Sequence, residues 1–279
     1  MRQRGNAENF AILLGAFAIA LPMVLAAVPA HAGVLRVCAD PNNLPFSNSR
    51  GEGFENKIAT LAARDFGYGL EYAFALQNAR FIKHTLGAGK CDVIIGVPAD
   101  LDEVATTEAY YASTYVFLSR KADNLRIERF TDPRLKTLTI GVHLIGDEST
   151  PPTLALAREG IVDNVRGYMI DGDFSKPDPP ARLIEAVADR DIDVAAVWGP
   201  FGGYFSAKSR IPLLMTPVHG AAAFAPLRFS FPIAMGVRKT DAVLRARLNN
   251  FITKERTAIR KILVDYRVPL VDMPGGVHG

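Results

Sequence analysis

Short apolar runs alternate with amphipathic segments along most of this chain. Residues 34–39, 70–74 and 92–97 are rich in β-branched and apolar side chains, which is typical of strands buried in a parallel sheet. Between them, residues 54–66 and 78–86 carry apolar side chains at helical spacing, and each segment ends at a glycine. The order strand, helix, strand, helix, strand predicts a doubly wound α/β lobe with right-handed crossovers.

The same alternation begins again after a charged, weakly periodic stretch at residues 119–133. We predict strands at 138–142, 165–170 and 193–198, helices at 153–158 and 181–188, and finally a strand at 231–237 followed by a helix at 241–264. The last strand and helix are left over from the second set and are expected to complete the first lobe. The predicted division is therefore lobe 1 at 33–119 and 230–279 and lobe 2 at 120–229, with a ligand cleft between the carboxyl ends of the two sheets.

The first 32 residues do not follow this pattern. Arg2 and Arg4 precede a long apolar stretch that is interrupted by Pro22, and residues 30–32 read Ala-His-Ala, the small-x-small pattern of a signal peptidase site. We predict a signal peptide at 1–32 and a periplasmic protein after its removal. A transmembrane anchor is the alternative, because the stretch approaches the ~18 apolar residues that can span a bilayer.

Charge and cysteine content narrow the possible functions. The formal net charge is +3 and Lys and Arg are scattered, so the chain has no electrostatic footprint for nucleic acid. Two cysteines, Cys38 and Cys91, invite a disulfide in an exported protein. Against it, extended neighbouring strands in ordinary register would hold the two Cα atoms beyond the ~7 Å limit for a bridge. The sequence therefore leaves the disulfide open.

A long polar loop, CADPNNLPFSNSRGEGFEN, joins the first strand to the first helix. In a doubly wound lobe this connection lies at the carboxyl end of the strand, where it faces the cleft. Its Asp and Asn side chains suit hydrogen bonds to backbone groups in tight turns, and its aromatic side chains are expected at the cleft or under its rim. The candidate contact residues in this loop are Asp40, Asn42, Asn43, Phe46 and Phe54.

Eight segments along the chain resemble one subgroup of the type II periplasmic solute-binding proteins. They read LRVCADPNNLPFS, GEGFENKIA, GKCDVIIGVPA, YYASTYVF, IGVHLIGDE, NVRGY, PPARLIEAV and DVAAVWGPFGGYF. From Leu35 to Leu270 the chain resembles the methanol-dehydrogenase-associated periplasmic binding proteins, which are encoded beside the quinoprotein methanol dehydrogenase and its cytochrome. The resemblance implies an α/β, two-lobed fold in which each lobe is a mainly parallel sheet flanked by helices. Within the subgroup, the sequence is more similar to the kind that accompanies the lanthanide-dependent enzyme than to the calcium-dependent kind.

One segment departs from the subgroup. Its members are expected to carry an aromatic, Arg-rich stretch of the type Trp-Trp-Pro-Gln-Arg-Arg after the second strand, whereas residues 73–80 here read AFALQNAR. Arg80 is the cation that remains and is kept as a candidate contact.

The charged ligand clamp of amino-acid-binding relatives is also missing. Those relatives pair an Arg after the third strand with the ligand carboxylate and an Asp at the end of a second-lobe strand with its ammonium group, because a buried zwitterion needs charge-assisted partners. Here the first position offers Asp100, Asp102 and Glu103, and the second-lobe strand ends in Trp198. Apolar and aromatic side chains remain at the predicted cleft, and such a concavity suits an apolar ligand or a peptide segment. They are Pro45, Phe46, Pro98, Trp198, Pro200, Phe201, Tyr204 and Phe205.

No catalytic motif accompanies this cleft. The histidines after the leader are not at metal-ligand spacing, and the chain has no nucleophile elbow, phosphate loop or haem-attachment motif. The carboxylates Asp40, Glu55 and Asp92 stand near strand ends or helix starts, where capping is the simplest role. We predict a protein that is not an enzyme and holds no metal or cofactor.

Together, the resemblance and the missing clamp predict a periplasmic accessory protein that binds a quinoprotein methanol dehydrogenase and matures or activates it. The dehydrogenase, which carries the cofactor PQQ, is the expected partner, with its cytochrome c as a second candidate. The alternative is a receptor for an importer that carries a small apolar or weakly polar solute.

Overall fold

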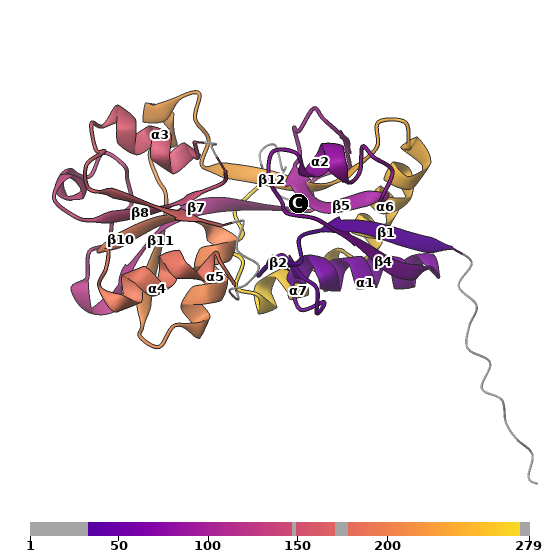
Figure 1. Cartoon of the computed structure of the whole chain (residues 1–279), viewed down its shortest axis with the longest axis horizontal. Helices are drawn as coiled ribbons and strands as arrows, with labels where there is room; N and C mark the ends of the chain where they lie inside the picture. The colour runs from indigo at the N-terminus through magenta and orange to yellow at the C-terminus, as the bar shows by residue number, and fades with distance from the viewer. Residues whose placement is uncertain (1–32, 147–148, 171–177, 274–279) are drawn as a thin grey trace, which may run out of the picture. The chain divides into compact units, whose positions relative to one another are not determined.

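The computed structural model describes residues 33–146, 149–170 and 178–273 (Figure 1). The predicted signal peptide at 1–32 lies outside these residues. Within them, no helix combines the length and the apolar character needed to cross a membrane.

The first part of the chain forms three neighbouring parallel strands. They are β1 (Val34–Ala39), β4 (Gly69–Phe74) and β5 (Val93–Pro98). The other elements before β7 are the short strands β2 (Asn42–Asn43), β3 (Ser47–Asn48) and β6 (Ala105–Thr106) and the helices α1 (Phe54–Phe66) and α2 (Phe81–His84). Helix α1 packs on β1, β4 and β5, because its apolar face, which includes the fully buried Phe54 and Ile58, matches the apolar face of the sheet.

The second part of the chain forms another parallel set, β8 (Ile140–Leu144), β9 (Val165–Met169) and β10 (Val194–Trp198). Its helices are α3 (Pro151–Arg158), α4 (Ala181–Asp189) and α5 (Gly199–Lys208), and short 3-10 helices occur at η1 (Lys121–Asp123), η2 (Pro133–Lys136) and η3 (Ala221–Phe224). The chain ends with α6 (Ala242–Lys254) and α7 (Arg256–Asp265), and both pack against α1.

Two long antiparallel strands join the two parallel sets. The strand order is β4-β1-β5-β12-β7-β10-β8-β9, and β11 (Leu213–Pro217) pairs with β7. The first residues of β7 (Tyr111–Arg120) pair with β12 (Ser230–Val237), and the later ones pair with β10 and β11. Figure 1 shows β7 and β12 running from one set to the other. The predicted two-lobed α/β fold is confirmed, while the lobe boundaries at 119/120 and 229/230 stay a prediction.

Several elements differ from the sequence prediction. The long C-terminal helix is interrupted at Glu255, and the predicted helix at 78–86 keeps one turn at Phe81–His84. Strand β7 was not predicted at all. Nearly every residue of β7 is buried, because both faces of the sheet are covered there. The strand therefore lacks the alternation of buried apolar and exposed polar residues by which a strand is usually predicted.

Cys38 and Cys91 form a disulfide, with 5.4 Å between their Cα atoms. The larger separation expected from extended strands was wrong. Cys38 lies beside Ile94 in the sheet, but β5 begins only at Val93, and Cys91 stands in the bend before it. The bend returns the chain toward β1, and the Asp92 amide donates to the Arg36 carbonyl at 2.7 Å. Extended-strand spacing therefore does not apply to Cys91.

Candidate functional site

A cavity of about 390 Å³ lies where the two sets of strands meet, and we call it the central pocket. Its walls come from the β5 and β10 ends, from β7, β12, α1 and α5, and from the segments that follow β4, β8 and β9. Most of the lining is apolar. The aromatic members are Phe46, Phe81, Tyr111, Tyr115, Trp198, Phe201 and Phe231, and the polar ones are Asn43, Glu55, Gln77 and Asn78.

Three aromatic rings from three different strands meet on one wall of the pocket. The ring centroids of Tyr115 on β7 and Trp198 on β10 are 5.3 Å apart, and those of Trp198 and Phe231 on β12 are 5.8 Å apart. Tyr115 and Phe231 are 6.5 Å apart. We call these rings the aromatic triad. Edge-to-face packing of this kind fixes the rings in place. All three residues line the pocket, and the guanidinium of Arg228 lies over the Phe231 ring, 5.1 Å from its centroid.

Glu55 brings a carboxyl group into this apolar site from the first turn of α1. The helix start is held by the preceding loop, since the carbonyls of Pro45 and Phe46 accept hydrogen bonds from the Phe54 and Glu55 amides. On β5, only a glycine leaves room for the carboxyl group, because a Cβ atom at Gly96 would collide with Oε1 of Glu55. The backbone therefore aims Glu55 at the pocket and at Gly96.

The Glu55 carboxyl forms no hydrogen bond or ion pair with any described residue. Burial among apolar and aromatic walls raises its pKa to about 8, because the charged form loses its hydration without gaining a partner. The start of α1 favours a negative charge, but that contribution is smaller than the cost of desolvation. Near pH 7 the group is therefore mostly a neutral carboxylic acid.

Replacing Glu55 by Gln should remove a pH dependence of stability. The folded-state pKa of Glu55 is about 8 and the ordinary value is 4.5, so between these pH values the folded protein holds a proton that the unfolded chain releases. The free energy of unfolding of the wild type should fall as pH rises through this window, by up to about 1.4 kcal/mol per pH unit, relative to E55Q. Denaturant melts of both proteins across the window measure this difference. Parallel curves for the two proteins would contradict the prediction.

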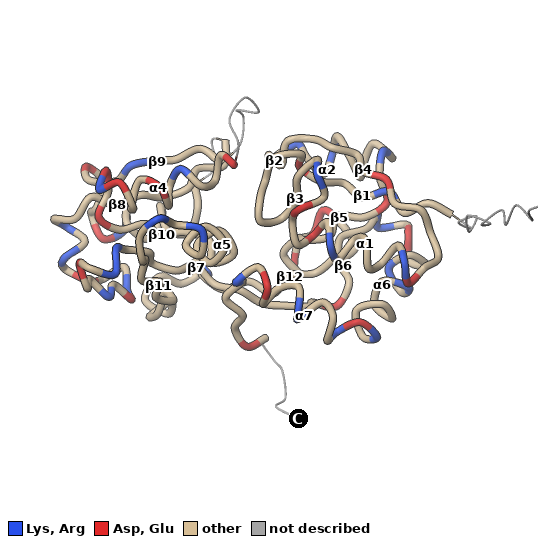
Figure 2. Tube along the Cα trace, turned by 90° about the horizontal axis from the view of Figure 1, so that it is seen from below, with Lys and Arg blue, Asp and Glu red and all other residues tan. Residues whose placement is uncertain are grey.

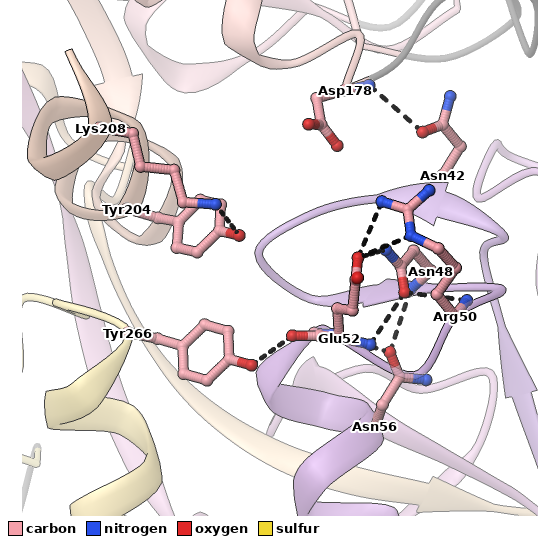
Figure 3. A network of polar contacts seen from close by, with 10 residues as sticks. Asn42, Asn48, Arg50, Glu52, Asn56, Asp178, Tyr204, Lys208 and Tyr266 are labelled. Carbon is pink, nitrogen blue, oxygen red and sulfur yellow. Dashed lines mark hydrogen bonds and ion pairs between the residues drawn. The ribbon is translucent and has the colours of Figure 1, made fainter. Parts of the chain in front are cut away.

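The polar loop after β1 satisfies its own backbone. Asn48 Oδ1 accepts from the Arg50 and Glu52 amides at 3.1 and 2.9 Å, and Asn56 Oδ1 accepts from the Asn48 and Gly53 amides, both at 3.0 Å (Figure 3). The side chain of Asp40 accepts from two backbone amides, those of Asn42 and Gln77, both at 2.8 Å. The loop is therefore held in one shape beside the pocket by its Asp and Asn side chains.

Two contacts link this loop region to elements that are distant in sequence. The Asp178 amide donates to Asn42 Oδ1 at 3.3 Å, and the Tyr266 hydroxyl donates to the Glu52 carbonyl (Figure 3). The ring of Tyr266 stacks on that of Tyr204, with 5.7 Å between centroids and 10° between planes. These contacts lie beside the pocket and do not line it.

The structure brings five of the predicted contact residues into the central pocket: Asn43, Phe46, Pro98, Trp198 and Phe201. The other predicted residues lie elsewhere. Asp40 and Asn42 shape the loop, Phe54 is fully buried beneath Phe46, Pro200 and Phe205 are buried within α5, Tyr204 stacks on Tyr266, and Arg80 lines a second hollow.

Sequence reasoning missed the residues of β7 and β12 that line the pocket, Tyr111, Tyr115, Phe231 and Ile233. Their spacing was a sequence signal for a shared surface, since Tyr111 and Tyr115 are four residues apart, Phe231 and Ile233 are two apart, and residues at these spacings in a strand lie on one face. Glu55 was noted only as a capping carboxylate. Its role in the pocket depends on walls that other strands supply.

The charge inventory of the pocket agrees with the missing clamp. Among the lining residues that the structure describes, none is Lys, Arg or His, and Glu55 is the single one with a carboxyl group. Within the described ranges, no group of three or more His, Cys, Asp and Glu could hold a metal ion. Over the rest of the described chain, the positions of Lys and Arg and those of Asp and Glu are interspersed along the backbone (Figure 2).

Residues 35–266 match the bacterial extracellular solute-binding proteins, family 3. The chain belongs to this family. In sequence, it is 33% identical over 252 residues to Protein MoxJ of Methylorubrum extorquens strain AM1, which covers 86% of this chain and 82% of that protein.

Solved structures agree with the sequence match. The periplasmic binding protein XoxJ from Methylobacterium extorquens AM1 is similar with a TM-score of 0.71 and 33% identity, over 86% of this chain and 100% of that one. MxaJ from Methlophaga aminisulfidivorans MPT is similar with a TM-score of 0.75 and 25% identity, over 85% and 100%. The resemblance to the methanol-oxidation-associated periplasmic binding proteins is thereby confirmed.

Proposed function

We propose that this chain is a non-catalytic periplasmic accessory protein that binds a quinoprotein methanol dehydrogenase and supports its maturation or activation. The observation that carries the proposal is the central pocket, whose described lining residues include no cation and so supply no ion-pair clamp of the kind found in an amino-acid receptor. The similarity to MoxJ, XoxJ and MxaJ supports the choice of partner.

A second hollow beside the pocket offers a surface for docking. It has a volume of about 480 Å³, and it shares Asn78 and Phe81 with the central pocket. Phe74 lies on its wall with 40% of its surface exposed, next to the cation of Arg80. A large apolar side chain and an Arg on one rim are the residue types that concentrate binding energy in protein interfaces.

Binding of purified methanol dehydrogenase should weaken at least tenfold in the double variant Phe74→Ser/Arg80→Ala, because an apolar anchor and a cation are removed together. Biolayer interferometry with calcium- and lanthanide-loaded dehydrogenases measures the affinity and identifies the preferred enzyme. The matched control is Val162→Ser, which removes an exposed apolar side chain that does not line the second hollow and should bind as the wild type does. If the wild type neither binds either enzyme nor changes the yield or methanol turnover of active enzyme, the proposed function is wrong.

The size of the central pocket favours a second candidate, a receptor that delivers a small weakly polar solute to an importer. A volume of about 390 Å³ is in the range of small-molecule sites. A thermal-shift screen of small metabolites tests it, since a ligand at 100 times its Kd adds about 2.7 kcal/mol to stability.

A further inference from the structure

The central pocket contains two acceptor groups that the protein itself leaves unsatisfied. One is the Glu55 carboxyl, which no described residue contacts by a hydrogen bond or ion pair. The other is Oδ1 of Asn43, a buried atom without a hydrogen-bond donor, although Nδ2 of the same side chain donates to Gln77 Oε1 at 2.9 Å. An unsatisfied buried acceptor is costly and rare, so Asn43 Oδ1 in the same cavity as the partly exposed, unpaired carboxyl group of Glu55 indicates a ligand that donates.

The walls around these acceptors favour a ligand with a positive charge. No described lining residue is a cation, and no described residue forms an ion pair with the Glu55 carboxylate. The rings of Tyr115 and Trp198 line the pocket, and their negative quadrupoles attract a cation within about 6 Å. Phe231 contributes less, because the guanidinium of Arg228 already lies over its ring, 5.1 Å from the centroid. A carboxylate and aromatic faces together compensate a desolvated organic cation better than either does alone.

A metal ion fits this site poorly. Hard divalent ions require about six or more oxygen ligands, whereas the described lining residues offer one carboxyl group and three amide side chains among apolar side chains. An alkylated ammonium ion matches both parts of the lining, because its carbon atoms pack on the rings and its charge faces the carboxylate.

We propose that the central pocket binds a small alkylammonium ion, with Glu55 as its counter-ion, Asn43 as a hydrogen-bond acceptor for any N–H group, and the aromatic triad packed against its alkyl groups. This site goes beyond the proposed docking of a dehydrogenase and does not depend on it. The same chemistry is present in a free ion and in the side chain of a lysine, and the test separates the two sources.

Binding of the cation should be linked to loss of a proton. Because the pKa of Glu55 is about 8, the free pocket is mostly protonated near pH 7, and the cation favours the ionised form. The other titratable groups near Glu55 are Tyr72 on β4, Tyr110 and Tyr111, and burial raises the pKa of each, so all stay neutral over this range. The residues of β5 and β12 that lie beside the Glu55 carboxyl, Gly96 and Ile233, have no titratable group. The association constant should therefore rise with pH, by up to tenfold per pH unit, and level off near pH 8.

Titration calorimetry of the full-length mature protein with choline tests this proposal, and its neutral carbon isostere 3,3-dimethylbutan-1-ol is the control ligand. At about pH 8.5, choline should bind at least tenfold more tightly than the isostere. The variant E55Q keeps the shape of the side chain and should lose at least tenfold in choline affinity, lose the pH dependence, and keep its affinity for the isostere. Trp198→Leu should weaken choline severalfold by removing a ring face, and it tests the site independently if E55Q folds poorly.

Further ligands distinguish the source of the cation. Methylammonium and N-acetyllysine methylamide are titrated in parallel. Tighter binding of the free ions supports a small-molecule ligand, and tighter binding of the lysine analogue supports a side chain of a protein partner. Equal affinity for choline and its isostere, an unchanged affinity in E55Q, or no binding of any cation up to about 10 mM would overturn the proposal. Dehydrogenase binding is measured separately with wild type and E55Q, so either idea can fail while the other stands.

Discussion

Replacing Arg120 by Met should lower the free energy of unfolding by roughly 2–5 kcal/mol, because the carbonyls of two buried residues lose their donor and two partly exposed carboxylates lose their cation. The guanidinium is 4% exposed at the end of β7. It donates to the carbonyls of Val187 and Ile192 at 2.8 and 2.7 Å and to the carboxylate of Asp193 at 3.2 Å. The same group also pairs with Asp123.

The matched control for this prediction is Arg190→Met. Arg190 pairs with the same carboxylate, Asp123, at 3.6 Å, but 66% of its side chain is exposed. Exposed ion pairs contribute about 0–1 kcal/mol, so this variant should stay close to the wild type in urea melts followed by circular dichroism. A loss of less than about 1 kcal/mol in Arg120→Met would show that the cluster does not stabilise the β7 end as its geometry implies. Arg120→Lys should fall between the two, because an ammonium group cannot span all four acceptors.

Removing the disulfide should lower the free energy of unfolding by about as much as the Arg120→Met substitution. The bridge closes a segment with a sequence separation of 53, and loss of that constraint on the unfolded chain corresponds to about 4 kcal/mol in the chain-entropy description. The double variant Cys38→Ala/Cys91→Ala is the appropriate test, because a single substitution leaves a free thiol. Its urea midpoint is compared with that of the oxidised wild type.

Two controls separate the bridge from the packing of the side chains. The reduced, alkylated wild type loses the bridge and keeps the cysteine residues, so it should be destabilised to a similar extent. Treating the double variant with a reductant should change nothing. Equal midpoints for the oxidised wild type and the double variant would mean that the unfolded chain is already restricted near these residues. In that case the bridge has another role.

Local sequence patterns correctly predicted those elements whose limits are set by neighbouring residues in the sequence. Helix α1 has the predicted bounds, because its apolar spacing and the glycine that ends it are local features. Strand β1 also has the predicted bounds, since its apolar run stops at Asp40. The patterns failed at β7, where burial on both faces removes the alternation that marks a strand. They failed again at Cys91, where a bend replaces extended chain.

The candidate site was predicted only in part for a similar reason. Phe46 and Trp198 follow strand ends, and the position of a strand end is readable from the sequence. Tyr115 and Phe231 belong to the middle and the start of antiparallel strands, and only the pairing of β7 with β12 brings their rings together. Phe54 has the same residue type as Phe46 and lies nearby in sequence, yet it faces the core because it points inward from α1.

The sequence by itself determined the family, the alternation of strands and helices, and the absence of the charged clamp, because each of these follows from residue types and their local spacing. The tertiary structure decided the chemistry of the pocket. Glu55 is an ordinary helix-start carboxylate in the sequence, and only the apolar walls from β5, β7 and β12 deprive it of water and of a partner. Desolvation depends on what surrounds a group in space, so no local pattern reports it.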